Sequence, residues 1–250
     1  MTSGSPSPQP HRSPPARFAT TQWSVVLAAA NAASPDSAVA LAELCRTYWY
    51  PIYAFVRRQG RSHDAAQDLT QDFFARLLDK RTIDDVGPEK GKFRTFLLVC
   101  LKRFLANEWE KATAQKRGGG RAELSIDFAD ADGRYTLEPS HDLTPQREFE
   151  RRWALTVLER ALAALADEFA AAGKTRLFDA LKAYLTGDAG AAPYADVAGQ
   201  LGMTEGAVKV AVHRLRERYR AALRREIAGT VADPAKVDEE IADLFAALGG

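Results

Sequence analysis

Apolar residues recur at spacings of three and four along most of the chain after Thr20, and no stretch alternates convincingly between apolar and polar positions. This periodicity predicts an all-α protein. In the first half we expect helices over residues 36–59, 63–79 and 91–116, with a short helix after Thr21 and a kink or break at Pro51. In the second half we expect helices from about residue 144 and over residues 174–185, 194–201, 204–227 and 234–248.

Two stretches without helical period divide the chain. Residues 1–19 are rich in Ser and Pro and hold no apolar run, which predicts a disordered tail and not a secretion signal. Residues 117–143 contain three consecutive Gly and then polar and acidic positions, which predicts an interdomain linker. We therefore expect two small helical domains, residues 20–116 and 144–229, joined by a long linker and followed by a helical C-terminal extension, residues 230–250.

Composition narrows the function. The formal net charge of the 250 residues is only +1, so an argument for nucleic-acid binding must rest on where the charge lies. Cys45 and Cys100 are expected to be buried, reduced thiols of a cytoplasmic protein. No apolar run is long enough for a transmembrane helix, and we expect no membrane partner. No metal-ligand cluster, phosphate-binding loop or nucleophile motif is present, so we expect neither an enzyme nor a cofactor nor a metal site.

The segment from Tyr194 to Tyr219 has the pattern of a helix-turn-helix. Ala198, Gly202 and Val208 stand at the spacing that lets a small residue, a left-handed turn and a branched apolar residue bring two helices together. Thr204 is expected to cap the second helix. Seven Lys or Arg and two Glu lie between residues 204 and 225, which favours contact with DNA phosphates, although a solvated basic helix pair would show the same pattern.

Two further helices of the first half carry charges of opposite sign. Residues 63–79 hold four Asp and one Arg, which indicates either a solvated face or a docking surface for a basic partner. Residues 92–121 hold eight Lys or Arg and two Glu, interleaved with aromatic residues. Cations that follow phosphates and rings that stack on bases suit single-stranded DNA. For Phe96 and Trp109 the sequence leaves a core position and a DNA contact equally open.

These three motifs, in this order, resemble the extracytoplasmic-function (ECF) subfamily of the sigma-70 family of RNA polymerase sigma factors. The run from Asp64 to Leu78 is similar to the family's polymerase-binding helix, the run from Phe93 to Arg117 to the helices that melt and read the −10 promoter element, and the helix-turn-helix to the module that reads the −35 element. The resemblance implies that residues 20–116 are sigma region two and residues 144–229 are sigma region four. It also implies a non-catalytic protein whose partners are core RNA polymerase, through the β′ clamp helices and the β flap, and promoter DNA.

The resemblance assigns residues to three sets. The polymerase set consists of Asp68, Gln71, Asp72 and Phe73. The −10 set consists of Phe96, Lys102, Arg103, Asn107 and Lys111, and the loop of residues 81–92 is expected to help trap a flipped base. The −35 set consists of Thr204, Lys209, Val210, His213, Arg214 and Arg216. Val210 is a departure from the family, in which a polar or basic residue often follows the Lys.

Two alternatives stay open at this point. A stand-alone helix-turn-helix regulator would bind duplex DNA without core polymerase, but it would leave the acidic helix and the basic aromatic helix without a role. The C-terminal extension carries an apolar stripe that is expected either to pack back on the second domain or to bind a regulator, such as an anti-sigma factor. The members of this stripe are Val237, Ile241, Leu244, Phe245 and Leu248.

Overall fold

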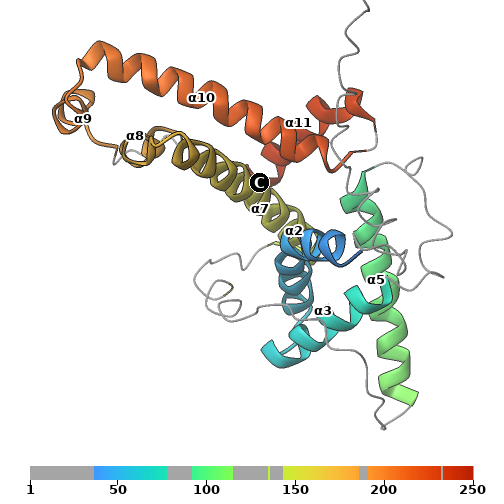
Figure 1. Ribbon diagram of the computed structural model, residues 1–250. Coiled ribbons are helices and arrows are strands. Elements are labelled where there is room, and N and C mark those ends of the chain that lie inside the picture. Colours follow the sequence, from blue (N-terminus) through green and yellow to red (C-terminus); the bar gives the residue numbers. More distant parts are fainter. Residues whose placement is uncertain are drawn as a thin grey trace, which may run out of the picture.

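The computed structural model describes residues 37–77, 92–114, 135, 143–185, 191–231 and 233–249. Every regular element within these ranges is a helix, so the prediction of an all-α fold is confirmed (Figure 1). The predicted tail, the short helix after Thr21, most of the linker and residues 81–91 of the expected loop lie outside the described residues. Among the described helices we find none that combines the length and the hydropathy of a membrane-spanning segment.

The first domain is built on three helices, α2 (Ser37–Arg58), α3 (His63–Leu77) and α5 (Phe93–Ala114). Their aromatic residues interlock edge to face, as between Phe73 and Phe104, whose ring centroids are 5.7 Å apart. Helix α2 runs unbroken through Pro51, so the predicted break is not observed. Pro51 and its neighbours are buried, and this packing offsets the roughly 3 kcal/mol that an interior Pro costs a helix.

Helix α7 (Pro145–Ala171) connects the two halves of the protein (Figure 1). The side chain of Thr144 caps it by accepting a hydrogen bond from the backbone N–H of Arg147. Its 27 residues span about 40 Å at 1.5 Å per residue. Phe149 and Trp153, in its first half, belong to the core that surrounds α2, whereas Leu165 and Phe169, near its end, belong to a second core.

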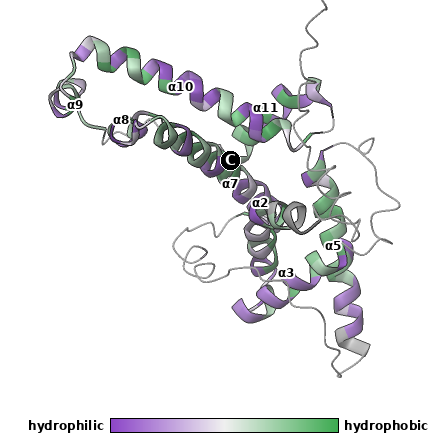
Figure 2. Ribbon diagram, in the orientation of Figure 1, coloured by the Kyte–Doolittle hydropathy of each residue, from purple (hydrophilic) through white to green (hydrophobic). Residues whose placement is uncertain are grey.

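The second domain forms an arm in which α7 and α10 (Glu205–Ala228) lie side by side, with α8 (Thr175–Leu181), the short helix η2 (Lys182–Tyr184) and α9 (Tyr194–Leu201) at its tip (Figure 1). Hydrophobic residues are interspersed with hydrophilic ones along both long helices (Figure 2). Their apolar sides meet in the second core, which includes Leu165, Val197, Val208 and Leu215. This core joins α8 and α9, at the tip of the arm, to the long helices α7 and α10.

The C-terminal extension forms η3 (Pro234–Lys236) and α11 (Val237–Leu248), and α11 packs back on α7 and α10. Val237 and Leu244 of the predicted apolar stripe are buried, but Phe245 is 55% exposed. Ile241 and Leu248 are partly buried against the same core, so Phe245 is the one member of the predicted stripe that faces outward, and α11 also buries the acidic residue Glu240. The core around α2 also takes in Leu223 and Ile227, from the end of α10, together with Leu244 of α11. One continuous core thus crosses the predicted domain boundary at residue 144.

Candidate nucleic-acid interface

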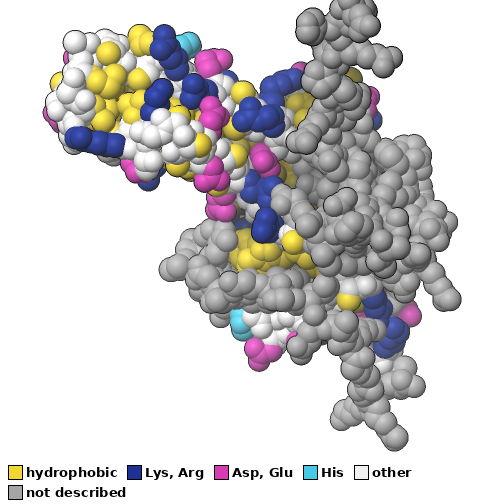
Figure 3. Space-filling model, viewed as in Figure 1, with side chains coloured by type: hydrophobic (Ala, Val, Ile, Leu, Met, Phe, Trp, Pro, Cys, Tyr) yellow, Lys and Arg dark blue, Asp and Glu magenta, His cyan; other side chains and the backbone are white. Residues whose placement is uncertain are grey.

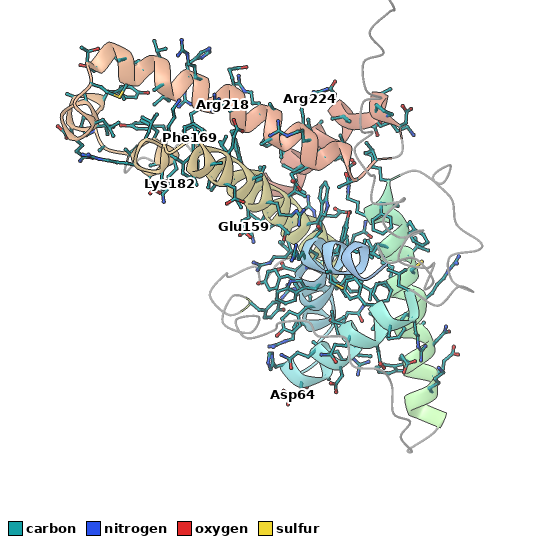
Figure 4. The ribbon with its side chains drawn as sticks, viewed as in Figure 1. Asp64, Glu159, Phe169, Lys182, Arg218 and Arg224 are labelled. Carbon is teal, nitrogen blue, oxygen red and sulfur yellow. The ribbon has the colours of Figure 1, made fainter. Side chains whose placement is uncertain are left out.

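Helix α3 presents acidic side chains at the surface of the first domain. Asp68 is exposed, and Gln71 and Asp72 are half-buried. Phe73, the fourth member of the polymerase set, is only 2% exposed and packs against Phe104. Phe73 therefore lies in the core beneath the acidic face, and its role in binding a partner stays a prediction. The acidic face continues to Asp64 at the start of α3 (Figure 4).

Helix α5 exposes a polar, cationic side and buries an apolar one. The side chains of Lys102, Arg103, Asn107 and Lys111 are all exposed. Phe96 is 9% exposed and its ring centroid lies 5.9 Å from that of Phe93, so the ring is part of the core, and a DNA contact by Phe96 stays a prediction. The wide apolar stripe of α5 places Phe96 toward the neighbouring helices.

Trp109 lies on the exposed side of the same helix. Its side chain is 60% exposed, and the Arg61 guanidinium stands 5.1 Å from the centre of its ring. An exposed indole beside cations offers a stacking face together with positive charge. The structure thus separates the two aromatic residues that the sequence left equivalent: Phe96 is a core residue and Trp109 is a surface residue.

The turn between α9 and α10 has the geometry that the sequence predicts. Gly202 ends α9 in the left-handed region, with φ 65°, where a side chain would be strained. The hydroxyl of Thr204 accepts a hydrogen bond from the backbone N–H of Ala207, at 3.2 Å, and so caps α10. Ala198 and Val208 are both buried where the two helices cross. The local predictions for the helix-turn-helix are therefore confirmed.

The −35 set is exposed, but its members differ in surroundings. Lys209, His213 and Arg216 follow one row of α10, in which Lys209 forms an exposed ion pair with Glu205 at 2.7 Å. The Arg216 guanidinium donates to the Tyr184 carbonyl oxygen at 3.0 Å, so Arg216 also joins α10 to η2. Lys and Arg side chains gather over the outer side of α10 (Figure 3). Thr204, by contrast, has its hydroxyl engaged in the cap.

Val210 and Arg214 follow a second row of α10, which borders a groove of about 450 Å³ between α10, α8 and the end of α7. Val210 is 50% exposed there. The groove is mainly apolar, and cationic side chains stand at its edge. Arg218 is one of them; its guanidinium lies 5.2 Å from the centre of the Phe169 ring, and the two side chains lie between α10 and α7 (Figure 4). The sequence placed Val210 and Arg214 with the DNA contacts and did not reveal this groove.

The two cysteines are partly buried and have no disulfide bond. Burial raises the pKa of the Cys45 thiol to about 12. Burial also raises the pKa of the Cys100 thiol to about 11, although the charge of Arg103 opposes the shift. Both sulfurs are therefore protonated at neutral pH and are poor nucleophiles.

Residues 44–115 match the Sigma-70 region 2 family. The match covers α2, α3 and α5, and thus the acidic face of α3 and the cationic face of α5. No curated protein and no solved structure matches the chain significantly. The matched domain supports a sigma factor of the sigma-70 family, and it implies contact with core RNA polymerase and with promoter DNA.

Proposed function

We propose that the protein is a sigma factor of the ECF subfamily, a non-catalytic and cytoplasmic subunit that brings core RNA polymerase to particular promoters. The observation that carries the proposal is the sigma-70 region 2 match over α2, α3 and α5. The helix-turn-helix of α9 and α10 supports it, because it supplies a second DNA-binding module at the position along the chain where sigma region four stands.

The acidic face of α3 is our proposed contact with the polymerase β′ clamp helices. Asp68 and Asp72 present negative charge at the surface, with Gln71 between them. Charge of one sign steers a complementary partner and fixes its register more than it adds affinity. Phe73 supports this face from below by holding α3 against α5.

The exposed side of α5 is our proposed contact with the −10 element. Opening the promoter costs a few kcal/mol for each unstacked base step, and capture of the unpaired bases offsets that cost. Lys102, Arg103 and Lys111 provide charge for the phosphates, and Trp109 provides an exposed ring for a base. In this proposed interface Trp109 has the stacking role that was predicted for Phe96.

The outer row of α10 is our proposed contact with the −35 element. Lys209, His213 and Arg216 suit phosphates and base edges in a major groove. The apolar groove beside Val210 and Arg214 is our proposed contact with the polymerase β flap. Val210 then lies between the two partners, and its apolar side chain suits either a thymine methyl group or the groove.

Binding to core polymerase separates this proposal from a stand-alone helix-turn-helix regulator. In a pull-down, the wild-type protein is expected to retain core enzyme, and Asp68→Arg with Asp72→Arg is expected to reduce retention at least tenfold. Asp68→Arg alone, at the exposed position, should give part of that loss without disturbing the core. A matched control reverses two exposed charges on α7, Glu159→Arg and Asp167→Arg, and should bind as wild type. Failure of the wild-type protein to bind core polymerase would overturn the sigma proposal and favour the regulator.

A further inference from the structure

Three carboxylates of α11 meet two cations at the start of α5, although about 150 residues separate them in the sequence. The Arg94 guanidinium grips Glu240 in bidentate fashion, with Nε at 2.6 Å from Oε1 and Nη2 at 3.0 Å from Oε2. It also donates to Asp243 at 2.6 Å. The Lys92 ammonium lies 3.0 Å from Glu239 and 3.1 Å from Glu240, and it contacts Asp243 as well. We call these five residues the acidic clasp.

The acidic clasp is largely withdrawn from water. Glu240 is fully buried, Arg94 is 8% exposed, and the Lys92 side chain is 16% exposed. Burial by itself lowers the pKa of Lys92, but the hydrogen bonds that its ammonium donates to Asp243, Glu239 and Glu240 outweigh burial and raise that pKa. Lys92 and Arg94, the two cations of the clasp, are thus both engaged by carboxylates of α11.

Arg94 also ties the clasp to α7. Its guanidinium lies 4.6 Å from the centre of the Trp153 ring, which is fully buried. On its other side α11 bonds to α10, where Arg224 donates to Asp238 (Figure 4). Helix α11 is therefore attached to the first domain through α5 and to the arm through α7 and α10. A single helix of the extension links the two halves of the protein.

The position of Lys92 in the chain connects the clasp with DNA binding. Lys92 is the last residue of the loop that is expected to trap a flipped base, and it directly precedes the DNA-facing helix α5. Carboxylates and phosphates compete for the same cations, because both are anions that accept hydrogen bonds from Lys and Arg. While the clasp is closed, the carboxylates of α11 contact Lys92, and Lys92 is therefore not available to DNA phosphates.

We propose that α11 is an autoinhibitory helix, whose carboxylates occupy Lys92 and Arg94 until promoter DNA and polymerase displace them. The inference rests on the proposed function for the place of DNA on α5. A contact made of ions suits such a switch, because its separated halves are well hydrated, whereas separated apolar surfaces are not. The geometry of the clasp and the burial of Glu240 carry the proposal.

The test uses the full chain and removes two charges that lie at the solvent edge. Glu239 and Asp243 have side chains 63% and 43% exposed, so Glu239→Gln with Asp243→Asn weakens the clasp and leaves the buried Arg94–Glu240 pair in place. Binding of a mixed-sequence single-stranded DNA, without polymerase, is expected to tighten about fivefold to tenfold. The dependence on salt should steepen by up to about one phosphate contact, because Lys92 loses two of its three carboxylate partners and keeps only Glu240.

The matched control is Asp233→Asn with Asp238→Asn, which makes the same change of net charge in the same extension without touching α5. Equal tightening in the two double variants would overturn the proposal, because charge alone would then explain it. Adding Lys92→Gln to Glu239→Gln with Asp243→Asn should abolish the gain, and persistence of the gain would also overturn the proposal. The pull-down with core enzyme decides the proposed function separately, since these DNA measurements contain no polymerase.

Discussion

The core around α2 buries four charged side chains, whereas no charged side chain is buried among the described residues between 162 and 221, which form most of the arm. The buried charges form two pairs, Arg94 with Glu240 and Arg152 with Glu148. The second pair lies at 2.6 Å on the first half of α7, where Arg152 stands 5.4 Å from the centre of the Tyr50 ring. Both pairs lie where α7 and α11 meet the first domain.

This contrast indicates what each core does. An apolar core such as that of Leu165 and Val208 needs only matching shapes, and it holds the helix-turn-helix to its supporting helices. A buried ion pair adds little net stability, but removing one partner leaves an uncompensated buried charge and is costly. The first core thus depends on matched charges where the arm and the extension meet the first domain, and the second core holds the arm together by apolar packing.

The largest effect is expected from removing one partner of the Arg94–Glu240 pair. Glu240→Ala should lower the free energy of unfolding by about 3–5 kcal/mol, because it leaves a buried guanidinium without its main partner. Asp238→Ala, on the same helix as Glu240, breaks an exposed pair with Arg224 of α10 and should change the free energy of unfolding little. Urea denaturation measures both. Arg94→Met with Glu240→Met should cost less than Glu240→Ala alone, and a larger cost would show that the pair contributes net stability.

The second core should respond differently to a cavity. Leu165→Ala is expected to cost about 3 kcal/mol, since Leu165 is fully buried. No Trp lies within residues 162–221, whereas Trp153 lies in the first core and Trp49 packs against it, so Trp fluorescence follows the first core and far-ultraviolet circular dichroism follows both. We expect the dichroism transition to move to lower urea more than the fluorescence transition. Leu162→Ala, at a half-buried position one turn earlier, should cost less. Equal shifts of the two transitions would show that the two cores unfold as one.

The two proposed DNA-binding surfaces differ in their exposed apolar side chain. The first domain exposes the aromatic ring of Trp109, and the arm exposes the aliphatic side chain of Val210. Trp109→Ala should weaken binding of single-stranded DNA by about 1–3 kcal/mol, the usual range for loss of a base-stacking ring. Val99→Ala is the matched control, because Val99 is also apolar and exposed on α5. Fluorescence anisotropy with a labelled oligonucleotide measures both. A loss of duplex binding as large as that of single-strand binding would contradict the separate roles of α5 and α10.

The smallest effect is expected on the arm. Lys209→Ala should weaken duplex binding modestly. It should also reduce the slope of log K against log salt concentration by about one, as expected for the loss of one phosphate contact. It should also weaken promoter-directed transcription. Lys182→Ala removes a comparable exposed Lys, paired with Asp179, from the same domain without touching α10. If Lys209→Ala leaves the salt dependence unchanged, Lys209 does not contact a phosphate.

The sequence by itself determined the local structure. Helical period, the Thr204 cap and the left-handed Gly202 depend on residues within a few positions of one another, and the predicted bounds of α9 and α10 agree with the observed ones within a residue. The exposed cations of α5 and the acidic surface of α3 were also visible, since charged side chains rarely enter a core without a partner.

Only the tertiary structure decided which aromatic residues face inward and which charges have partners. Phe73, Phe96 and Trp109 all lie on apolar or mixed helix faces, and the packing of neighbouring helices buries the first two and exposes the third. Arg94 and Glu240 each look like an ordinary surface residue in the sequence. Their pairing depends on the path of nearly 150 residues between them, and no local pattern encodes it because desolvation and its compensation arise only when α5 and α11 meet.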